Sequence, residues 1–267
     1  MSSYLFVPGN NPGMVQSAQV FGASGIIYDL EDAVSIKDKD SARDLLKEYL
    51  KTTMFENVYI RINDIFELGK EEINTFDHLA ISGYVVPKAS VNVMNEVKKY
   101  TNKLLIPIIE TPEAVLTMKE IGEFENVSGM LLGGEDLATN IDVVRTEDDI
   151  ELLYARHKLV MVCAYLGVDS IDTPFTDTDN DETLEESVKY SKAIGMSARS
   201  SIHPNQIPII NEIYKPTLEE IEFATKVIKA AEINDSGVFS VDGKMVDLPV
   251  IIRAKNILKK VKDYAKV

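Results

Sequence analysis

The stretch IPIIETPEAV, residues 106–115, contains an apolar run that ends abruptly on a carboxylate. Residues 106–109 have the composition of a buried strand, and Glu110 follows them directly. Thr111 and Pro112 then supply a capping hydroxyl and a proline for the first helical position, a combination typical of a helix start. The stretch therefore predicts a strand that passes into a helix within one turn. The carboxylate at the junction is costly to bury unless something pairs with it.

The same alternation of a short apolar run and an amphipathic segment repeats along the chain. Several of the runs are apolar on both faces, as expected for parallel strands covered on both sides. Eight such units predict a TIM (β/α)8 barrel, and an open doubly wound sheet is the alternative. No glycine-rich dinucleotide fingerprint follows an early strand, which weighs against the open sheet. The predicted strands are residues 5–8, 25–30, 58–62, 84–87, 104–109, 129–133, 169–173 and 198–202. The predicted helices lie near residues 12–22, 38–50, 67–81, 91–101, 112–122, 147–166, 181–195 and 204–214.

The C-terminal part differs from these repeats, so residues 1–214 are expected to form the catalytic barrel and residues 215–267 a helical appendage or lid. TLEE at 217–220 has capping-box spacing at the start of an amphipathic helix. Asp242-Gly243 is typical of a turn, and a last helix is expected near 249–264. The appendage would either pack on the barrel or reach a neighbouring subunit and its active site.

The composition narrows the class of protein. The chain has 267 residues and a formal net charge of −15, which argues against nucleic acid or an anionic membrane as its main partner. No apolar run is long enough for a transmembrane helix, and the N-terminus lacks the features of a signal peptide. The single cysteine, Cys163, excludes an internal disulfide and is expected to pack in the core. These features favour a cytoplasmic protein.

Polar and mostly ionisable residues follow the carboxyl ends of the predicted strands. In a (β/α)8 barrel these ends form the face at which active sites lie. A single residue of this kind is usually a solvated loop residue, but so many of them favour one shared site at the barrel mouth. The residues are Asp29-Leu30-Glu31-Asp32, Arg61-Ile62-Asn63, Pro87-Lys88, Glu110-Thr111, Gly133-Gly134-Glu135-Asp136, Asp172-Thr173 and Ile202-His203-Pro204.

The donor atoms in this set are mainly oxygens. The three histidines are scattered, so local spacing builds no zinc cluster. Glu110 and Asp136 could coordinate a hard divalent cation, for which Mg²⁺ is the favoured candidate, with waters and substrate completing the octahedron. Arg61 would offer a planar fork to a substrate carboxylate or enolate, and Gly133-Gly134 could expose backbone N–H groups to a substrate oxygen. Such a site stabilises an enolate but leaves lyase, aldolase, synthase and isomerase open.

Nine segments, in this order, resemble the citrate lyase beta subunit and its relatives. These proteins belong to the HpcH/HpaI-type, Mg²⁺-dependent aldolase and acyl-CoA lyase superfamily, which is built on a TIM barrel. The resemblance spans about residues 4 to 255. The segments are LFVPGNNPGM, YDLEDAV, IRIN, VPKA, IETPEAV, GGEDLATN, SIDTP, SSIHPNQI and DGKMVDLPV.

The resemblance implies roles for the residues at the mouth. Glu110 and Asp136 would be the metal ligands, and Arg61 would bind the substrate carboxylate or carbonyl. Glu31 and Asp32 would lie beside the metal, in contact through waters. Asp32 also aligns with the position at which related pyruvate aldolases carry a catalytic histidine.

Further residues are implied to bind the acyl thioester or to act between subunits. The Pro8-Gly9-Asn10-Asn11 loop and the Ile202-His203-Pro204 segment resemble parts of the thioester site, and Gly134 and Glu135 are assigned to substrate binding. In relatives the aspartate that corresponds to Asp247 enters an adjoining subunit's site as an acid/base. Judged from its surroundings alone, Asp247 is a turn residue or a helix cap. Relatives often carry a lysine at the position of Arg199, so the thioester contacts and the acyl carrier are left open.

The resemblance implies a carbon–carbon lyase that cleaves a 3-hydroxy-3-carboxylic acyl thioester of the citryl-CoA or citryl-acyl-carrier-protein type. The products would be a 2-oxo acid such as oxaloacetate and an acyl thioester. One alternative is a malate or citramalate synthase-like activity or a citramalyl- or malyl-CoA lyase. Another is a partner subunit of a multi-subunit citrate lyase that is inactive alone. A homo-oligomer is expected, with trimers usual in this group, and other citrate lyase subunits are further candidate partners.

Overall fold

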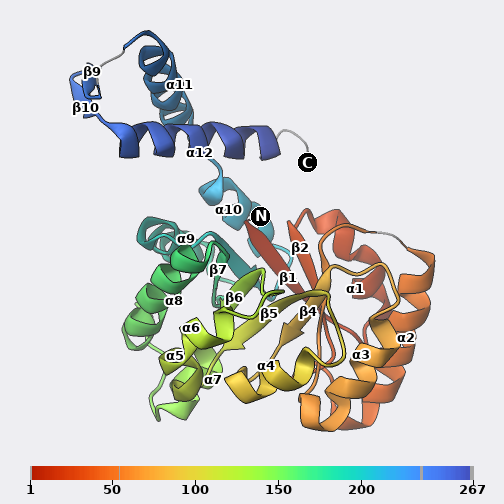
Figure 1. Cartoon of the computed structure of the whole chain (residues 1–267). Coiled ribbons are helices and arrows are strands. Elements are labelled where there is room, and N and C mark those ends of the chain that lie inside the picture. The colour runs from red at the N-terminus through yellow and green to blue at the C-terminus, as the bar shows by residue number, and fades with distance from the viewer. Residues whose placement is uncertain (1, 54, 235–236, 265–267) are drawn as a thin grey trace. The chain divides into compact units, whose positions relative to one another are not determined.

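The chain folds into a closed barrel of eight parallel strands, β1 to β8, in which each strand pairs with the next and β1 pairs with β8 (Figure 1). The computed structural model describes residues 2–53, 55–234 and 237–264. The predicted TIM barrel is confirmed, and each strand lies where the apolar runs predicted it, within two residues at either end. The strands are β1 Ser3–Pro8, β2 Gly25–Asp29, β3 Val58–Arg61, β4 Gly83–Val86, β5 Leu104–Ile109, β6 Gly129–Leu132, β7 Asp169–Asp172 and β8 Ala198–Ser201.

Helices follow the strands and cover the outside of the barrel (Figure 1). The predicted cap of the fifth unit is present, since the Thr111 hydroxyl accepts the N–H of Ala114 at 3.1 Å. The helix expected over 112–122 divides at Thr117 into two short helices. The helices are α1 Pro12–Ser17, α2 Lys39–Thr52, α3 Lys70–Phe76, α4 Val91–Val97, α5 Pro112–Leu116, α6 Met118–Gly122, α7 Gly134–Asn140, α8 Leu153–Leu166, α9 Asp181–Ile194 and α10 Gln206–Tyr214.

Helix α7 was not predicted, although it carries Asp136. The sequence suggested only that the strand ends at Gly133, whereas the Gly133 carbonyl already accepts the N–H of Leu137 at 3.1 Å and begins a helical turn. Two glycines have low helix propensity, so local sequence gave no helix signal at this point.

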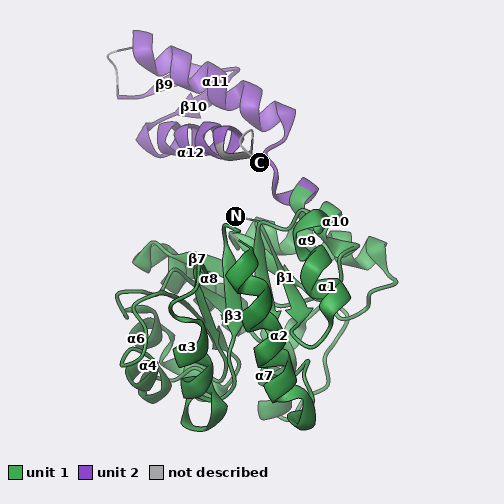
Figure 2. Cartoon of the chain, turned by 90° about the vertical axis from the view of Figure 1, so that its right-hand side faces the viewer, with its two compact units in different colours: residues 1–211 green, residues 212–267 purple. Residues whose placement is uncertain are grey.

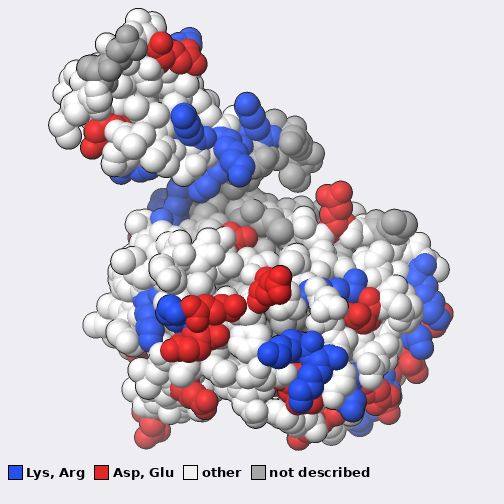
Figure 3. Space-filling model, viewed as in Figure 1, with Lys and Arg blue, Asp and Glu red and all other residues white. Residues whose placement is uncertain are grey.

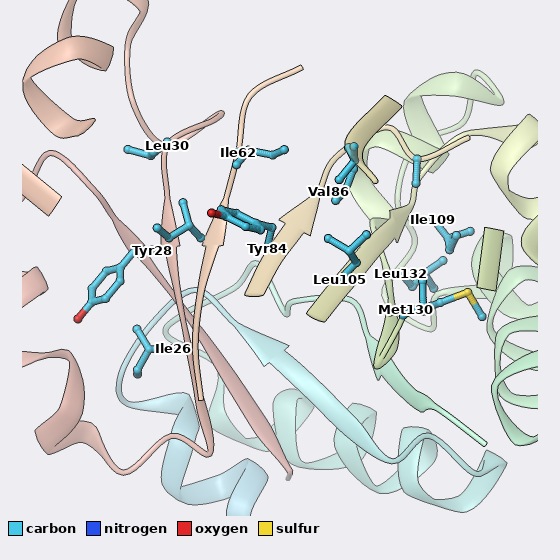
Figure 4. Close-up of a cluster of buried hydrophobic side chains, with 14 of the residues drawn as sticks. Ile26, Tyr28, Leu30, Ile62, Tyr84, Val86, Leu105, Ile109, Met130 and Leu132 are labelled. Atoms are coloured by element: carbon cyan, nitrogen blue, oxygen red, sulfur yellow. The ribbon is translucent and has the colours of Figure 1, made fainter. Parts of the chain in front are cut away.

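The core has two layers, because successive residues of a strand face opposite sides of the barrel wall. The outward-facing series, which includes Ile26, Tyr28 and Met130, packs against the helices (Figure 4). Cys163 of α8 is 1% exposed, as expected of a core residue. The inward-facing series fills the barrel itself with Tyr4, Phe6, Ile27, Tyr59, Val85, Ile106, Ile108, Leu131, Ile171 and Ala198.

The chain divides into two compact units, residues 1–211 and 212–267 (Figure 2). The boundary expected after residue 214 lies at the end of α10, three residues beyond the observed division. The C-terminal unit contains α11 Leu218–Ile233, the hairpin of β9 Phe239–Val241 and β10 Lys244–Val246, and α12 Leu248–Tyr264. Its own small core consists of Ala224, Val227, Val241, Val246 and Ala254.

The local signals of the C-terminal unit are confirmed. Thr217 and Glu220 form the capping box of α11. Asp242 and Gly243 both have positive φ, as the two central residues of a tight hairpin turn require.

Helix α12 is basic, and Figure 3 shows a group of lysine and arginine side chains on this unit. None of the helices in the described part of the chain has the length and apolar character needed to cross a membrane.

Candidate active site

The inward-facing series changes from apolar to polar at the carboxyl ends of the strands. Ile27 is followed two residues later by Asp29, Tyr59 by Arg61, and Ile108 by Glu110. The same alternation leads from Leu131 to Gly133 and from Ile171 to Thr173. These five polar or small residues line one pocket of about 280 Å³, together with Pro8, Asp32, Gly134, Glu135 and Asp136. Strand period alone thus brings the predicted residues together at the barrel mouth.

Arg61 and Asp29 form a two-point ion pair across the neighbouring strands β3 and β2, where they are register partners. Nε of Arg61 lies 2.7 Å from Oδ1 of Asp29, and Nη2 lies 2.5 Å from Oδ2. The remaining nitrogen, Nη1, is 3.0 Å from Oε2 of Glu31 and 3.9 Å from Oδ2 of Asp32. The guanidinium was expected to present its whole fork to a substrate. Instead, two of its nitrogens are bound to Asp29, and the third, Nη1, is paired with Glu31.

Asp29 also organises the loop that carries the other acidic residues. Its two carboxylate oxygens accept the N–H groups of Glu31 at 2.8 Å and Ala33 at 3.2 Å. Asp29 is 1% exposed, so this loop is tied to a buried and fully hydrogen-bonded anchor. As a result Glu31 faces Arg61, while Asp32 keeps a side chain that is 62% exposed.

The carboxylate of Glu110, which follows an apolar strand in the sequence, is buried in the structure and has little around it to neutralise its charge. The residue is 3% exposed, and Oε1 accepts the backbone N–H of Lys88 at 2.5 Å. Burial raises the pKa of Glu110 to about 8; the Lys88 N–H opposes this shift, and the nearby carboxylates of Asp136 and Glu31 add to it. A buried carboxylate that repels a neighbouring carboxylate is well suited to a bound cation.

The donor set fits Mg²⁺, which commonly takes one or two carboxylates and keeps several waters. Glu110 and Asp136 line the same pocket. Within the described residues no group of three or more histidines, cysteines, aspartates and glutamates converges as a metal site, so water and substrate oxygens would complete the coordination. Glycine is required beside Glu110, since a Cβ at Gly133 would lie only 2.6 Å from both Cβ and Oε2 of Glu110.

The backbone N–H groups of Gly133 and Gly134 are already used within the protein. Gly133 donates to the carbonyl of Ile109 and Gly134 to Oγ1 of Thr173, both at 3.0 Å. The expectation that these amides are offered to a substrate oxygen is therefore not met in this structure. Gly134 instead provides space, because its Cβ would lie 2.7 Å from Oγ1 of Thr173.

Glu135 is paired with an arginine that the sequence analysis did not single out. Nη1 of Arg145 lies 2.5 Å from Oε1 of Glu135, and the same guanidinium pairs with Asp149 and with Glu151. Arg145 thereby connects the first turn of α7, next to Asp136, to the segment that leads into α8. The charged run VRTEDD in the sequence was the only signal, and it is equally typical of a solvated loop.

Asp172 and Arg199 do not face the mouth. They are register partners at the outward positions of β7 and β8, where Nη1 of Arg199 lies 3.4 Å from Oδ2 of Asp172. Nε of Arg156, on α8, donates to Oδ1 of Asp172 at 3.0 Å, and Ser191 of α9 contacts both partners. Burial alone would raise the pKa of Asp172, but the two arginines outweigh it and lower that pKa. The prediction that Asp172 lies at the mouth is wrong, and Arg199 fixes helices to the barrel wall instead of lining the pocket.

The remaining predicted residues are placed as follows. Pro8 and Ile202 line the pocket, whereas Asn10 and His203 are not among its lining residues. Nδ1 of His203 accepts the N–H of Asn205 at 3.3 Å. Asp247 belongs to the C-terminal unit, where Oδ1 accepts the N–H of Val250 at 3.2 Å and caps α12. Its function in a neighbouring subunit stays a prediction, as do the catalytic and ligand roles of the other residues.

The fold and the pocket define an α/β-barrel enzyme with an acidic, oxygen-donating mouth. Residues 2–204 match the model of the HpcH/HpaI aldolase/citrate lyase family, and the chain belongs to this family, as its ordered segments predicted. It is therefore a lyase-type enzyme. It is 34% identical to the citrate lyase subunit beta of Leuconostoc mesenteroides over 96% of this chain and 91% of the relative. It is 29% identical to a (3S)-malyl-CoA thioesterase of Cereibacter sphaeroides over 98% and 95% of the two chains.

Two solved structures of Mycobacterium tuberculosis proteins are similar to this chain. CitE in complex with magnesium, acetoacetate and coenzyme A has a TM-score of 0.85 at 26% identity and covers 98% of both chains. A citrate lyase beta subunit complexed with oxaloacetate and magnesium has a TM-score of 0.72 at 25% identity, over 80% of this chain and 96% of the other.

Proposed function

We propose that the chain cleaves a 3-hydroxy-3-carboxylic acyl thioester, of the citryl-CoA or citryl-acyl-carrier-protein type, in a Mg²⁺-dependent reaction. The products are a 2-oxo acid, with oxaloacetate the leading candidate, and an acyl thioester. The observation that carries this proposal is the pocket in which Glu110 and Arg61, at the carboxyl ends of β5 and β3, meet Asp136 of the first turn of α7. The ligands of the similar tuberculosis structures, oxaloacetate, coenzyme A and magnesium, support it.

The carboxylates of Glu110 and Asp136 would hold Mg²⁺, with Glu31 and Asp32 in contact through waters. When bound, the ion supplies a Lewis acid for the oxygens of the 2-oxo acid. The protein's own contribution is positioning. Asp29 fixes two nitrogens of Arg61, so the guanidinium plane is held in place and Nη1, which is paired with Glu31, is the nitrogen left to donate to a substrate oxygen.

The bond-breaking step needs one base and one acid. Asp32 lines the pocket and keeps an exposed carboxylate, so we propose that it is the base that accepts the proton of the substrate's tertiary hydroxyl. The electrons of that O–H bond form the new carbonyl, and those of the C–C bond pass to the thioester half as an enolate. Asp247 of a neighbouring copy would return a proton to the enolate carbon, which requires at least a dimer.

We propose a cytoplasmic homotrimer, and a fully active monomer on gel filtration would contradict this role of Asp247.

A second candidate is cleavage or hydrolysis of a malyl-type thioester, which the similarity to a malyl-CoA thioesterase favours. A synthase-like condensation and a subunit role in a larger lyase are the further alternatives. Incubating the purified chain and Mg²⁺ with citryl-, citramalyl- or malyl-CoA, or with acetyl-CoA plus glyoxylate, separates them. Oxaloacetate released from citryl-CoA supports the lyase. Free CoA from acetyl-CoA plus glyoxylate supports the synthase, and activity only after partner subunits or a carrier protein are added supports the subunit role.

A further inference from the structure

Lys88 links the two acidic groups of the mouth through two different parts of the residue. It follows β4 directly, and its φ of 47° places it in the left-handed region, which is unfavourable for a residue with a side chain. This conformation accompanies the hydrogen bond from its backbone N–H to Oε1 of Glu110. Strained backbone of this kind concentrates at functional sites, where the surrounding structure maintains it.

The side chain of Lys88 contacts the second acidic group, Glu31. Its Nζ lies 3.2 Å from Oε1 of Glu31, and 56% of the side chain is exposed. The ammonium is thus held in an ion pair with a carboxylate at the mouth while most of its stem stays open to solvent. An exposed ammonium on a flexible stem can exchange one carboxylate partner for another.

Arg61 is far less available for such an exchange. Its side chain is only 14% exposed, two of its nitrogens are bound to Asp29, and the third is bound to Glu31. Moving it would leave the buried carboxylate of Asp29 without its partner, which is costly. The positive charge that can reach a ligand at the edge of the mouth is therefore better provided by Lys88.

The chemistry of the proposed products shows where that charge is needed. Oxaloacetate differs from pyruvate in one group, a distal carboxylate on the carbon that is a methyl group in pyruvate. The 2-oxo acid end would be bound through the Mg²⁺ that Glu110 and Asp136 would hold. The distal carboxylate would then enter a pocket that is also lined by Asp32, whose like charge repels it unless a cation is present.

We propose that the Lys88 ammonium binds the distal carboxylate of a dicarboxylic 2-oxo acid and so makes the enzyme prefer oxaloacetate-forming over pyruvate-forming substrates. The inference rests on the proposed lyase function and names the substrate class of the same site. The backbone N–H of Lys88 has a separate task, which is to orient Glu110. Substitutions that keep the backbone can therefore isolate the side chain.

Three variants separate these roles. Lys88→Met keeps the aliphatic stem without the charge, and Lys88→Arg keeps the charge. Lys88→Gly removes the whole side chain but adopts positive φ freely, so its N–H can still bind Glu110. Lys99→Met is the matched control, because Lys99 is a similarly exposed lysine paired with Glu96 away from the pocket.

The readout is calorimetric binding of freshly dissolved, cold oxaloacetate and of pyruvate in the presence of Mg²⁺, with Mg²⁺ binding measured separately. Loss of one charge-assisted hydrogen bond predicts about tenfold weaker oxaloacetate binding in Lys88→Met and Lys88→Gly. Pyruvate binding should stay within about twofold of wild type on the same reasoning. Lys88→Arg should retain oxaloacetate binding close to that of the wild type. Mg²⁺ affinity should be retained in all variants. The ratio of kcat/KM for citryl-CoA to that for citramalyl-CoA should fall in parallel.

Two outcomes would overturn the role of Lys88 while leaving the proposed function intact. One is unchanged oxaloacetate binding in Lys88→Met, and the other is an equal loss of oxaloacetate and pyruvate binding. A wild-type chain that binds neither oxo acid with Mg²⁺ would overturn the proposed function itself, and the assignment of Lys88 with it.

Discussion

The substitution Gly133→Ala tests whether the carboxylate of Glu110 must lie where the structure places it. An added Cβ would lie 2.6 Å from Cβ and Oε2 of Glu110 and 2.9 Å from Cγ2 of Ile108. Non-bonded carbons pack at about 3.5–4.0 Å, so Glu110 or β6 must move by about 1 Å. Overpacking of this size costs about 1–3 kcal/mol of stability. A displacement of about 1 Å at a reacting centre lowers the rate by about a hundredfold.

The assay for Gly133→Ala compares Mg²⁺ binding by calorimetry, kcat/KM for citryl-CoA, and the unfolding free energy from urea titration. Gly129→Ala is the matched control. Gly129 belongs to the same inward-facing series of β6 at its other end, where a Cβ would lie 3.1 Å from Asp169. We expect Gly129→Ala to lose stability while keeping Mg²⁺ affinity, and Gly133→Ala to lose both. Wild-type Mg²⁺ affinity and turnover in a folded Gly133→Ala protein would refute the reasoning.

Two further predictions concern buried charges. Because the pKa of Glu110 is raised to about 8 without metal, a proton competes with Mg²⁺ below that pH. Mg²⁺ affinity by calorimetry should fall by about tenfold per pH unit below about pH 8 and level off above it; a flat profile from about pH 6 to about pH 9 would contradict this. Arg199→Met leaves the fully buried Asp172 with one arginine fewer, so it should cost about 3–5 kcal/mol in urea unfolding while the KM for citryl-CoA stays unchanged. A shifted KM with unchanged stability would instead place Arg199 in contact with substrate.

Much of the architecture could be predicted from the chain alone, because the relevant signals are local. Apolar runs with β-branched residues define the strands, and Thr111-Pro112 defines a helix start in two residues. The residues after the strands could be assigned to one face as a group, since all parallel strands of a barrel end at the same rim.

The face of each individual residue could not be predicted, because strand period decides it only when the register is known. Asp172 and Thr173 are adjacent in sequence, yet Thr173 lines the pocket and Asp172 points to the helices. The resemblance linked Arg199 to the thioester site, whereas its side chain lies at an outward position beside Asp172. The left-handed backbone of Lys88 accompanies a long-range hydrogen bond to Glu110, which lies 22 residues away. The local sequence VPKA contains no signal for this backbone conformation.

The most direct test of the account is oxaloacetate release from citryl-CoA by EDTA-treated protein that is given back Mg²⁺. Wild-type protein should recover its activity with added Mg²⁺. Glu110→Ala and Asp136→Ala should remain folded by circular dichroism and release no oxaloacetate at any Mg²⁺ concentration at which the wild type is active. Wild-type activity in either variant, or full activity of the wild type in EDTA, would contradict a metal held by these two carboxylates.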